Sequence, residues 1–268
     1  MMSKKPIITM LTDFGENDSY VGCMKGVILS IDSNIKIVDI SHNIPSYNMA
    51  SAAYMLTTYY ELFPKGTVHM VVVDPGVGGS REAIAVELND YYFVLPDNGI
   101  ATLVINRFAG RYTARRIENP EVMSSNVSST FHGRDIFAPA AAKLATGFDF
   151  NEIGPEHAGT RVIKTVIPQA RRGKVEGSVV HIDKFGNYIT NINNANLSEI
   201  NKGALLVSIG GYTIMGLSKT YSEKEPGELI AYVGSTGNVE IGVVKGSAVD
   251  VIGLPAGSWV TVRKRGVD

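Results

Sequence analysis

The chain has 268 residues, 44% of them hydrophobic and 19% charged, which is enough for one large or two smaller folded domains. Its formal net charge of −1 provides no overall positive field, which argues against a protein that binds nucleic acid or an anionic membrane. A single cysteine excludes an intrachain disulfide bond and fits the reducing cytoplasm. The first residues contain only a short apolar run, so we expect neither a signal peptide nor a membrane span.

The first half of the chain alternates between strand and helix patterns. We expect strands over residues 7–11, 36–40, 68–73, 84–88 and 92–95. We expect helices over residues 20–31, 48–63, 100–108 and 135–146. The run 68–73 is nearly continuously apolar, as in a strand buried on both faces. This alternation predicts an α/β domain with a mostly parallel sheet.

The pattern changes after a looser stretch of turn residues, 151–173. Beyond it, apolar residues recur with a period of two in short runs separated by Gly, Asn and Ser. We expect strands over residues 175–182, 188–192, 204–209, 228–233, 239–244, 248–252 and 259–262. Many short strands of this kind predict a small barrel or sandwich. The chain is therefore predicted to contain an N-terminal α/β domain, 1–165, and a C-terminal all-β, barrel-like domain, 174–268.

Three strings place ionisable residues beside glycine at the ends of predicted elements: TDFGENDSY (12–20), DPGVGGSR (74–81) and TFHGRD (130–135). Asp13 and Asp74 follow predicted strands, and ligand groups gather at the carboxyl ends of parallel strands. A carboxylate at Asp13 suits vicinal hydroxyls such as those of a ribose. Asp18 is either a ligand contact or, like Ser19, a cap of the following helix.

The string DPGVGGSR is not a dinucleotide-binding fingerprint, because its glycines do not fit G-x-G-x-x-G and a strand pattern follows it. It exposes Asp74 on a turn and holds Arg81 near it. This pair either braces the turn or combines with His132 into a base assembly. We favour the base assembly, because Asp, Arg and His together suit proton transfer.

Two strings of the second half are candidate ligand contacts. In DKFGNYITNI (183–192), Phe185 could stack on a flat base and Asn187 could bind its edge, although the same string suits a hairpin turn. In GSTGNVEIG (234–242), Ser235 and backbone N–H groups could hold a carboxylate, or the string could be only a turn.

Taken together, the strings LTDFGENDSYVGCMKGVI, VVDPGVGGSR, LPDNG, STFHGRDIFAPAAA and DKFGNYITNI resemble the S-adenosylmethionine hydroxide adenosyltransferase family, relatives of the fluorinase and chlorinase. The resemblance extends from Ile7 to Val262. It implies an N-terminal α/β domain and a C-terminal β-barrel-like domain. It also implies a homotrimer that binds substrate between one subunit's N-terminal domain and its neighbour's C-terminal domain. The implied reaction converts S-adenosylmethionine and water into adenosine and L-methionine without a cofactor or metal.

Matching motifs imply the site residues. The water-activating triad would be Asp74, Arg81 and His132. The substrate contacts would be Asp13 on the ribose, Asp18 and Asp183 near the ammonium group, Phe185 and Asn187 on the adenine, Ser235 on the carboxylate, and Tyr47 and Tyr221 as aromatic pocket residues. Whether Asp74 or His132 takes the proton stays open, because the two could titrate as a unit.

Three departures and three alternatives accompany the resemblance. Halogenating relatives carry Tyr at the position of Asp74, and the fluorinase carries Ser at that of Gly133, so both differences favour water over halide. Val244 stands where the family often has Asn, which leaves one adenine contact open. The alternatives are a halogenase, a nucleoside-binding protein without catalysis, and a metal-dependent hydrolase. The hydrolase would use Asp13, Asp18, Asp74, His132 and Asp135.

Overall fold

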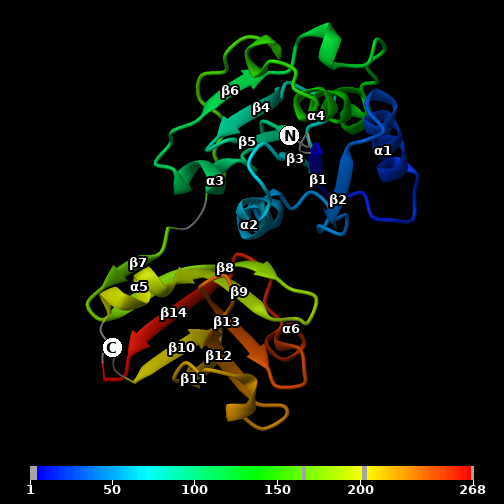
Figure 1. Ribbon diagram of the computed structural model, residues 1–268. Helices are drawn as coiled ribbons and strands as arrows, with labels where there is room; N and C mark the ends of the chain where they lie inside the picture. The colour runs from blue at the N-terminus through cyan, green and yellow to red at the C-terminus, as the bar shows by residue number, and fades with distance from the viewer. Residues whose placement is uncertain (1–4, 165–166, 201–203, 267–268) are drawn as a thin grey trace. The chain divides into compact units, whose positions relative to one another are not determined.

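The computed structural model describes residues 5–164, 167–200 and 204–266, and the chain forms two compact units, Met1–Ile163 and Lys164–Asp268 (Figure 1). Residues 165 and 268, at which we predicted the two domains to end, lie outside the described residues. Each unit has its own buried apolar core. Among the described helices, none is both long enough and apolar enough to cross a membrane.

The N-terminal unit is built on a six-stranded mixed sheet. In spatial order its strands are β2 (Lys36–Ser41), β1 (Ile7–Thr12), β3 (Val68–Val72), β5 (Tyr91–Pro96), β4 (Ala83–Leu88) and β6 (Thr113–Arg116). The first four strands pair in parallel, and β4 pairs antiparallel with both β5 and β6. Every residue of β3 is buried, as its nearly continuous apolar run predicts.

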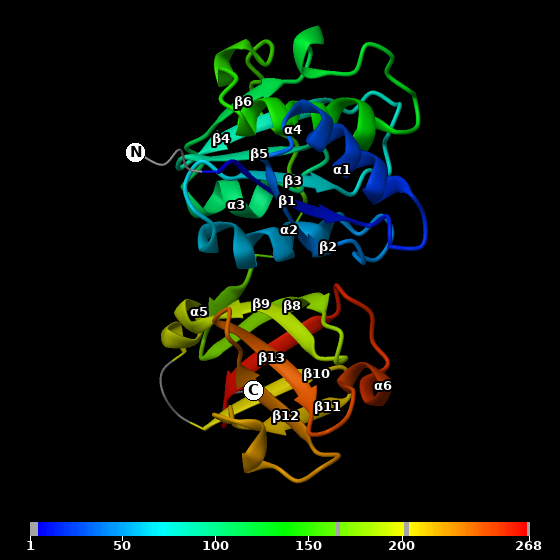
Figure 2. The same ribbon diagram turned by 45° about the vertical axis from the view of Figure 1, so that its right-hand side comes forward.

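Helices cover both faces of this sheet (Figure 2). One face carries α1 (Tyr20–Ile31) and α4 (Ala138–Ala145), and the other carries α2 (Met49–Tyr59) and α3 (Thr102–Arg107). Residues of β3 alternate between the two cores: Met70 packs with the α1 and α4 side chains, whereas Val71 packs with those of α2 and α3. The predicted α/β architecture is therefore confirmed.

Within each unit, short helices connect the longer elements. These are the 3-10 helices Tyr60–Leu62, Pro120–Val122, Phe150–Glu152 and Tyr221–Glu223, and the π-helix Gly133–Phe137, which runs directly into α4. The helices predicted over 48–63 and 135–146 are thus each composed of two consecutive elements. A π-turn inside a helical segment often marks a functional position, and here it directly follows His132.

The C-terminal unit is an antiparallel, nearly closed, barrel-like sheet, as predicted. Its strands follow the order β11 (Tyr212–Met215), β10 (Leu205–Ile209), β14 (Trp259–Lys264), β8 (Lys174–Ile182), β9 (Tyr188–Asn193), β13 (Asn238–Val243) and β12 (Leu229–Val233), with β7 (Gln169–Arg171) paired to β8. Two short helices, α5 (Asn194–Glu199) and α6 (Ala248–Ile252), connect strands of this sheet.

The strand predicted over 248–252 is wrong, because this segment is α6. The hydroxyl oxygen of Ser247 accepts a hydrogen bond from the amide of Asp250 and so caps the helix start. Gly253 ends the helix with a φ of +72°, a conformation that glycine adopts without penalty. The apolar alternation suggested a strand, but these two local caps decide the structure.

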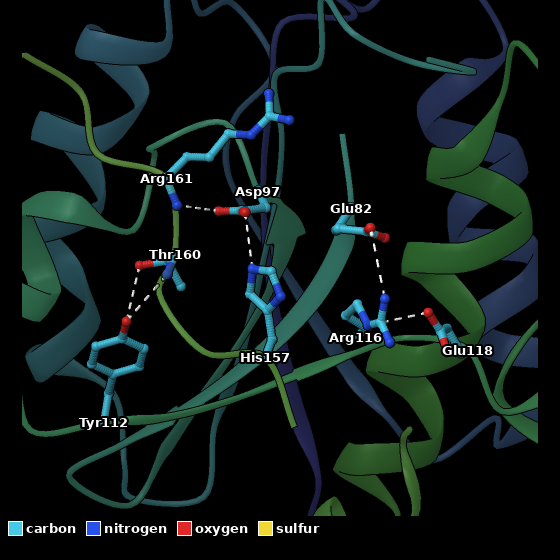
Figure 3. Close-up of polar contacts among 8 residues, drawn as sticks. All are labelled: Glu82, Asp97, Tyr112, Arg116, Glu118, His157, Thr160 and Arg161. Carbon is cyan, nitrogen blue, oxygen red and sulfur yellow. Dashed lines mark hydrogen bonds and ion pairs between the residues drawn. The ribbon is translucent and has the colours of Figure 1, made fainter. Parts of the chain in front are cut away.

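Polar contacts bind the last residues of the N-terminal unit, 157–161, to its own sheet (Figure 3). Asp97, directly after β5, is buried and accepts hydrogen bonds from the backbone amide of Arg161 at 2.7 Å and from Nε2 of His157 at 3.0 Å. The hydroxyl of Tyr112 lies 3.2 Å from that of Thr160. Residues 157–161 therefore belong structurally to the N-terminal unit.

Candidate active site

Two of the predicted acidic residues lie at the same edge of the N-terminal sheet. The parallel neighbours β1 and β3 end in register, with Thr12 opposite Val72. Asp13 follows β1 directly, and Asp74 follows β3 after one residue. Because α/β proteins gather ligand groups at the carboxyl ends of their parallel strands, this edge is the candidate site.

Arg81 joins Asp74 and His132. Its Nε lies 2.8 Å from Oδ1 of Asp74, and its Nη2 lies 2.5 Å from Oδ2. The same Nη2 lies 2.6 Å from Nδ1 of His132. The side chains of Arg81 and Asp74 are each 5% exposed, so this charge-assisted pair is shielded from bulk water. The structure thus brings all three residues of the predicted triad into contact.

The contact with Arg81 decides where His132 carries its proton. A guanidinium group has only hydrogen-bond donors, so Nδ1 of His132 must be an unprotonated acceptor. Neutral His132 therefore carries its hydrogen on Nε2. Burial lowers the pKa of His132, and the nearby Arg81 charge lowers it further, against the weaker opposing effect of Asp74 and Asp135. His132 is accordingly a neutral donor at Nε2.

Backbone contacts hold the two loops of the triad together. Gly78 has a φ of +74°, and a Cβ atom at this position would lie 2.2 Å from the carbonyl oxygen of Ser129. The buried carboxylate of Asp135 accepts hydrogen bonds from the backbone amide of Ser128 at 2.9 Å and from Nε of Arg134 at 2.6 Å. Asp135 therefore supports the loop that carries His132.

A pocket of about 150 Å³ lies beside the triad. Its polar wall includes Asp74 and His132, and its apolar wall includes Phe14, Tyr20 and Phe131. The three rings pack against one another, with centroid separations of 5.2 Å for Tyr20 and Phe131 and 6.0 Å for Phe14 and Phe131. A small reactant bound here would therefore meet a carboxylate in a partly apolar environment.

Asp13 is bound to the backbone of Tyr47, another predicted contact. The amide of Tyr47 donates to Oδ2 of Asp13 at 2.9 Å. Tyr47 has a φ of +66°, which is uncommon for a bulky residue, and its side chain is 69% exposed. Such backbone strain clusters at functional sites. The loop is also held by His42, whose carbonyl accepts from the amide of Gly15 at 2.7 Å.

Asp18 lies in the exposed loop before α1. The alternative prediction that Asp18 or Ser19 caps this helix is not supported, because Ser19 occupies the cap position without a side-chain hydrogen bond. The structure therefore leaves the Asp18 carboxylate accessible near the loop of Asp13.

The C-terminal unit brings together three further predicted residues. A pocket of about 440 Å³ is lined by Phe185, Asn187 and Tyr221. Phe185 is 73% exposed, whereas Asn187 is buried. Asp183 accepts hydrogen bonds from the amides of both Phe185 and Asn187 and from Nδ2 of Asn187, each at 2.9 Å. The start of the segment 183–192 is thus a turn, which agrees with the alternative that it forms a hairpin turn. This turn presents an aromatic ring and an amide to one pocket.

Ser235, like Asp183, is a predicted contact of the C-terminal unit that does not line this pocket. It lies exposed in the turn between β12 and β13, which is closed by a hydrogen bond from the amide of Gly237 to the carbonyl of Gly234 at 2.9 Å. Its hydroxyl is accessible to a ligand, but its position alone supports the turn alternative equally well.

Three of the four carboxylates named in the metal-site alternative have other partners. Asp74 is paired with Arg81, Asp135 with Arg134, and Asp13 with the amide of Tyr47. Across the described ranges, no group of three or more His, Cys, Asp or Glu side chains is arranged to hold a metal ion.

Sequence reasoning missed two residues beside the C-terminal pocket. The hydroxyl of Tyr232 donates to Oε2 of Glu240 at 2.7 Å and lies 2.6 Å from the hydroxyl of Tyr221. Glu240 is the only charged residue of the apolar strand β13, and this was the available signal.

Comparisons with known proteins agree with this architecture. The sequence matches the family models described as the SAM hydroxide adenosyltransferase N-terminal domain, over residues 8–154, and C-terminal domain, over residues 177–261. A protein from Thermus thermophilus named (R)-S-adenosyl-L-methionine hydrolase is 35% identical over 93% of this chain and 96% of its own. A protein of the same name from Salinispora tropica is 31% identical over 97% and 99%.

A solved structure of an uncharacterized conserved protein from Thermotoga maritima superimposes with a TM-score of 0.90 at 36% identity, covering 96% of this chain and 100% of that one. Fold, sequence and the matched domains therefore agree along nearly the whole length. The chain belongs to the SAM hydroxide adenosyltransferase family.

Proposed function

We propose that the protein hydrolyses S-adenosyl-L-methionine to adenosine and L-methionine by attack of water at C5′ of the ribose. The observation that carries this proposal is the contact of one guanidinium, that of Arg81, with both Asp74 and His132. This arrangement combines a buried carboxylate base with fixed donors, and water needs both because it is a weak nucleophile. The relatives named (R)-S-adenosyl-L-methionine hydrolase support the assignment.

In the proposed step, the water oxygen forms a bond to C5′ as the C5′–S bond breaks. The sulfur keeps the bonding electron pair and leaves as the neutral thioether of methionine, so no general acid is needed there. Asp74 accepts the water proton, while the Nε2–H of His132 orients the water oxygen. Arg81 fixes both groups and stabilises charge on the developing hydroxide. This proposal makes Asp74 the proton acceptor. The sequence left open whether Asp74 or His132 has this role.

The remaining predicted residues bind the substrate in this proposal. Their roles are the ribose hydroxyls for Asp13, the ammonium group for Asp18 and Asp183, the adenine for Phe185 and Asn187, the carboxylate for Ser235, and the aromatic pocket for Tyr47 and Tyr221. The shared pocket of Phe185, Asn187 and Tyr221 supports the adenine assignment.

The active protein is a homotrimer in this proposal, with each site formed by the N-terminal domain of one subunit and the C-terminal domain of its neighbour. The family resemblance supports this assembly, as does the division of the predicted contacts between the two units. We further assign the protein to the cytoplasm, supported by its single cysteine, and we assign no cofactor to the reaction.

Halogenation is the second candidate reaction, and the triad disfavours it. The Asp74 carboxylate faces the pocket of Phe14 and Phe131, where its negative charge would repel a halide. Gly133 lines the same pocket, and a Cβ atom there would lie 3.1 Å from Sδ of Met24, so a larger residue would crowd this wall.

The test is incubation with S-adenosylmethionine in ¹⁸O-labelled water, with and without chloride and a chelator, followed by mass spectrometry. We expect adenosine labelled at the 5′-oxygen, at a yield that neither addition changes. A chlorinated nucleoside would assign the protein to the halogenases. Chelator-sensitive turnover would favour the metal-site alternative, and binding without turnover would favour a nucleoside-binding protein.

A further inference from the structure

Three side chains of the C-terminal unit form a hydrogen-bonded chain that ends at the pocket of Phe185 and Asn187. Oε2 of Glu240 accepts from the hydroxyl of Tyr232 at 2.7 Å, and this hydroxyl lies 2.6 Å from that of Tyr221. Tyr221 lines the pocket, whereas Glu240 is only 9% exposed and does not. The chain therefore connects a buried acid to a tyrosine that lines the pocket.

The carboxylate decides the direction of both hydrogen bonds. Burial raises the pKa of Glu240, so the direction applies at mildly alkaline pH, where the group is ionised; ionised Glu240 has only lone pairs, and Tyr232 must donate its one proton to it. The oxygen of Tyr232 is then an acceptor, and the short contact with Tyr221 requires the Tyr221 hydroxyl to donate. Burial and the contacts with Tyr221 and Glu240 raise the pKa of Tyr232, which keeps this proton on the ring oxygen. With its proton committed, Tyr221 can only accept a further hydrogen bond.

Asp183 orients the side-chain amide of Asn187, so that Asn187 also presents a hydrogen-bond acceptor. Its Nδ2 donates to Oδ2 of Asp183 at 2.9 Å, which directs the amide oxygen, Oδ1, away from Asp183. A Cβ atom at Gly242 would lie 2.5 Å from this oxygen and 3.0 Å from the hydroxyl of Tyr221. Two acceptors, one amide oxygen and one phenol oxygen, thus converge beside the backbone of Gly242.

We propose that Glu240, acting through Tyr232, makes Tyr221 a hydrogen-bond acceptor, so that Tyr221 and Asn187 together select a purine with a 6-amino group over one with a 6-oxo group. An amino group donates two hydrogens, one to each oxygen, whereas a carbonyl oxygen offers only lone pairs and would be repelled by both. The inference rests on the proposed function in that the adenine moiety occupies this pocket. Glu240 and Tyr232 are positioning residues, because they act through Tyr221.

The test compares binding of adenosine and inosine by calorimetry at mildly alkaline pH, with turnover of S-adenosylmethionine measured in parallel. We expect the protein to prefer adenosine by roughly tenfold to a hundredfold, the effect of leaving polar groups wrongly paired. Glu240→Gln, whose amide can donate as well as accept, should reduce this preference about tenfold, and Tyr221→Phe should reduce it similarly. Matched controls, Glu176→Gln on β8 and Tyr212→Phe on β11, should keep it.

The preference is a ratio for one protein sample, so a loss of folded protein would not change it. An unchanged ratio in both Glu240→Gln and Tyr221→Phe overturns the inference, and so does equal or absent binding of the two nucleosides by the unmodified protein. Selective binding that the variants abolish, without any turnover of S-adenosylmethionine, would support the inference and overturn the proposed function instead.

Discussion

Nη2 of Arg81 lies 2.6 Å from Nδ1 of His132, and this contact makes a histidine that could have been a base into a fixed donor. The same nitrogen binds Asp74, so the positions of the acid and the imidazole are coupled through one group. Replacing the guanidinium group of Arg81 should therefore displace both Asp74 and His132.

Arg81→Lys tests this coupling. The side chain of lysine ends in a single nitrogen, so it cannot bind the Asp74 carboxylate through two nitrogens and also bind His132. We therefore expect turnover to fall about 10²–10³-fold. Adenosine binding should change less than threefold, since adenosine contacts are assigned elsewhere. Arg116→Lys is the control, because Arg116 forms exposed ion pairs with Glu82 and Glu118 (Figure 3). Equal losses in both variants would contradict a specific role of Arg81.

The pKa of His132 is lowered by burial and by Arg81, and this determines the acid side of the pH profile. Protonation at Nδ1 would break the contact with Arg81, but it requires a pH below the ordinary histidine range near 6.5. We expect steady-state turnover to stay constant down to that range and to fall only below it. In His132→Asn, whose amide oxygen can still accept from Arg81, turnover should be lower and this acid limb should move or disappear. An identical limb in the variant would assign the titration to another group.

Gly78→Ala should separate the loop that carries Asp74 and Arg81 from the loop that carries His132. The added Cβ would meet the carbonyl oxygen of Ser129 at 2.2 Å, so the backbone must move. Gly110→Ala is a matched control, because Gly110 has a φ of +75° and no atom within 4 Å of the added Cβ. Both variants carry the penalty for a left-handed residue, about 1 kcal/mol, and Gly78→Ala should lose about 1–3 kcal/mol more in urea unfolding. Only Gly78→Ala should also lose turnover; equal behaviour of the two would show that the loop contact is dispensable.

His69 should make the N-terminal unit sensitive to acid. It is fully buried, its Nδ1 lies 2.8 Å from the hydroxyl of Thr9, and burial lowers its pKa to about 3. Below the unfolded value of 6.5, the unfolded chain binds a proton that the folded chain does not. Stability is therefore complete above 6.5 and falls as the pH drops toward 3, by up to about 1.4 kcal/mol for each pH unit.

Replacing both partners, Thr9→Val with His69→Phe, should remove this contribution without leaving the Thr9 hydroxyl facing an apolar ring. The measurement is urea unfolding at several pH values between the two limits. If the double variant loses stability with acid as steeply as the unmodified protein, His69 is not responsible for the acid sensitivity.

The sequence predicted the architecture well because the spacing of apolar residues along each segment indicates which side chains are buried. The nearly continuous apolar run of β3 and the alternation in the second half required no long-range information. It failed at α6, where one serine cap and one left-handed glycine override an apolar alternation. Cap geometry depends on a few atoms, and periodicity does not report it.

The site residues show a similar division. Asp74, Arg81 and His132 could be selected because Gly-rich loops at the ends of predicted elements are conspicuous in the sequence, and the parallel order of β1 and β3 explains why Asp13 and Asp74 lie at the same edge of the sheet. Tyr232 and Glu240 could not, because they lie inside strands, and only the antiparallel pairing of β12 with β13 places them opposite each other. Pairing of this kind is a long-range property of the fold.

The buried carboxylate of Asp97 has a practical consequence for dissecting the protein. The match to the N-terminal family model ends at residue 154, yet Asp97 is bound by His157 and by the amide of Arg161, and Thr102 by the amide of Ile163. A fragment cut at residue 154 would lose every one of these bonds and leave the Asp97 carboxylate without these partners. A separately expressed N-terminal fragment should therefore extend through Ile163, and a protease that cleaves between residues 155 and 163 should act only after this segment detaches.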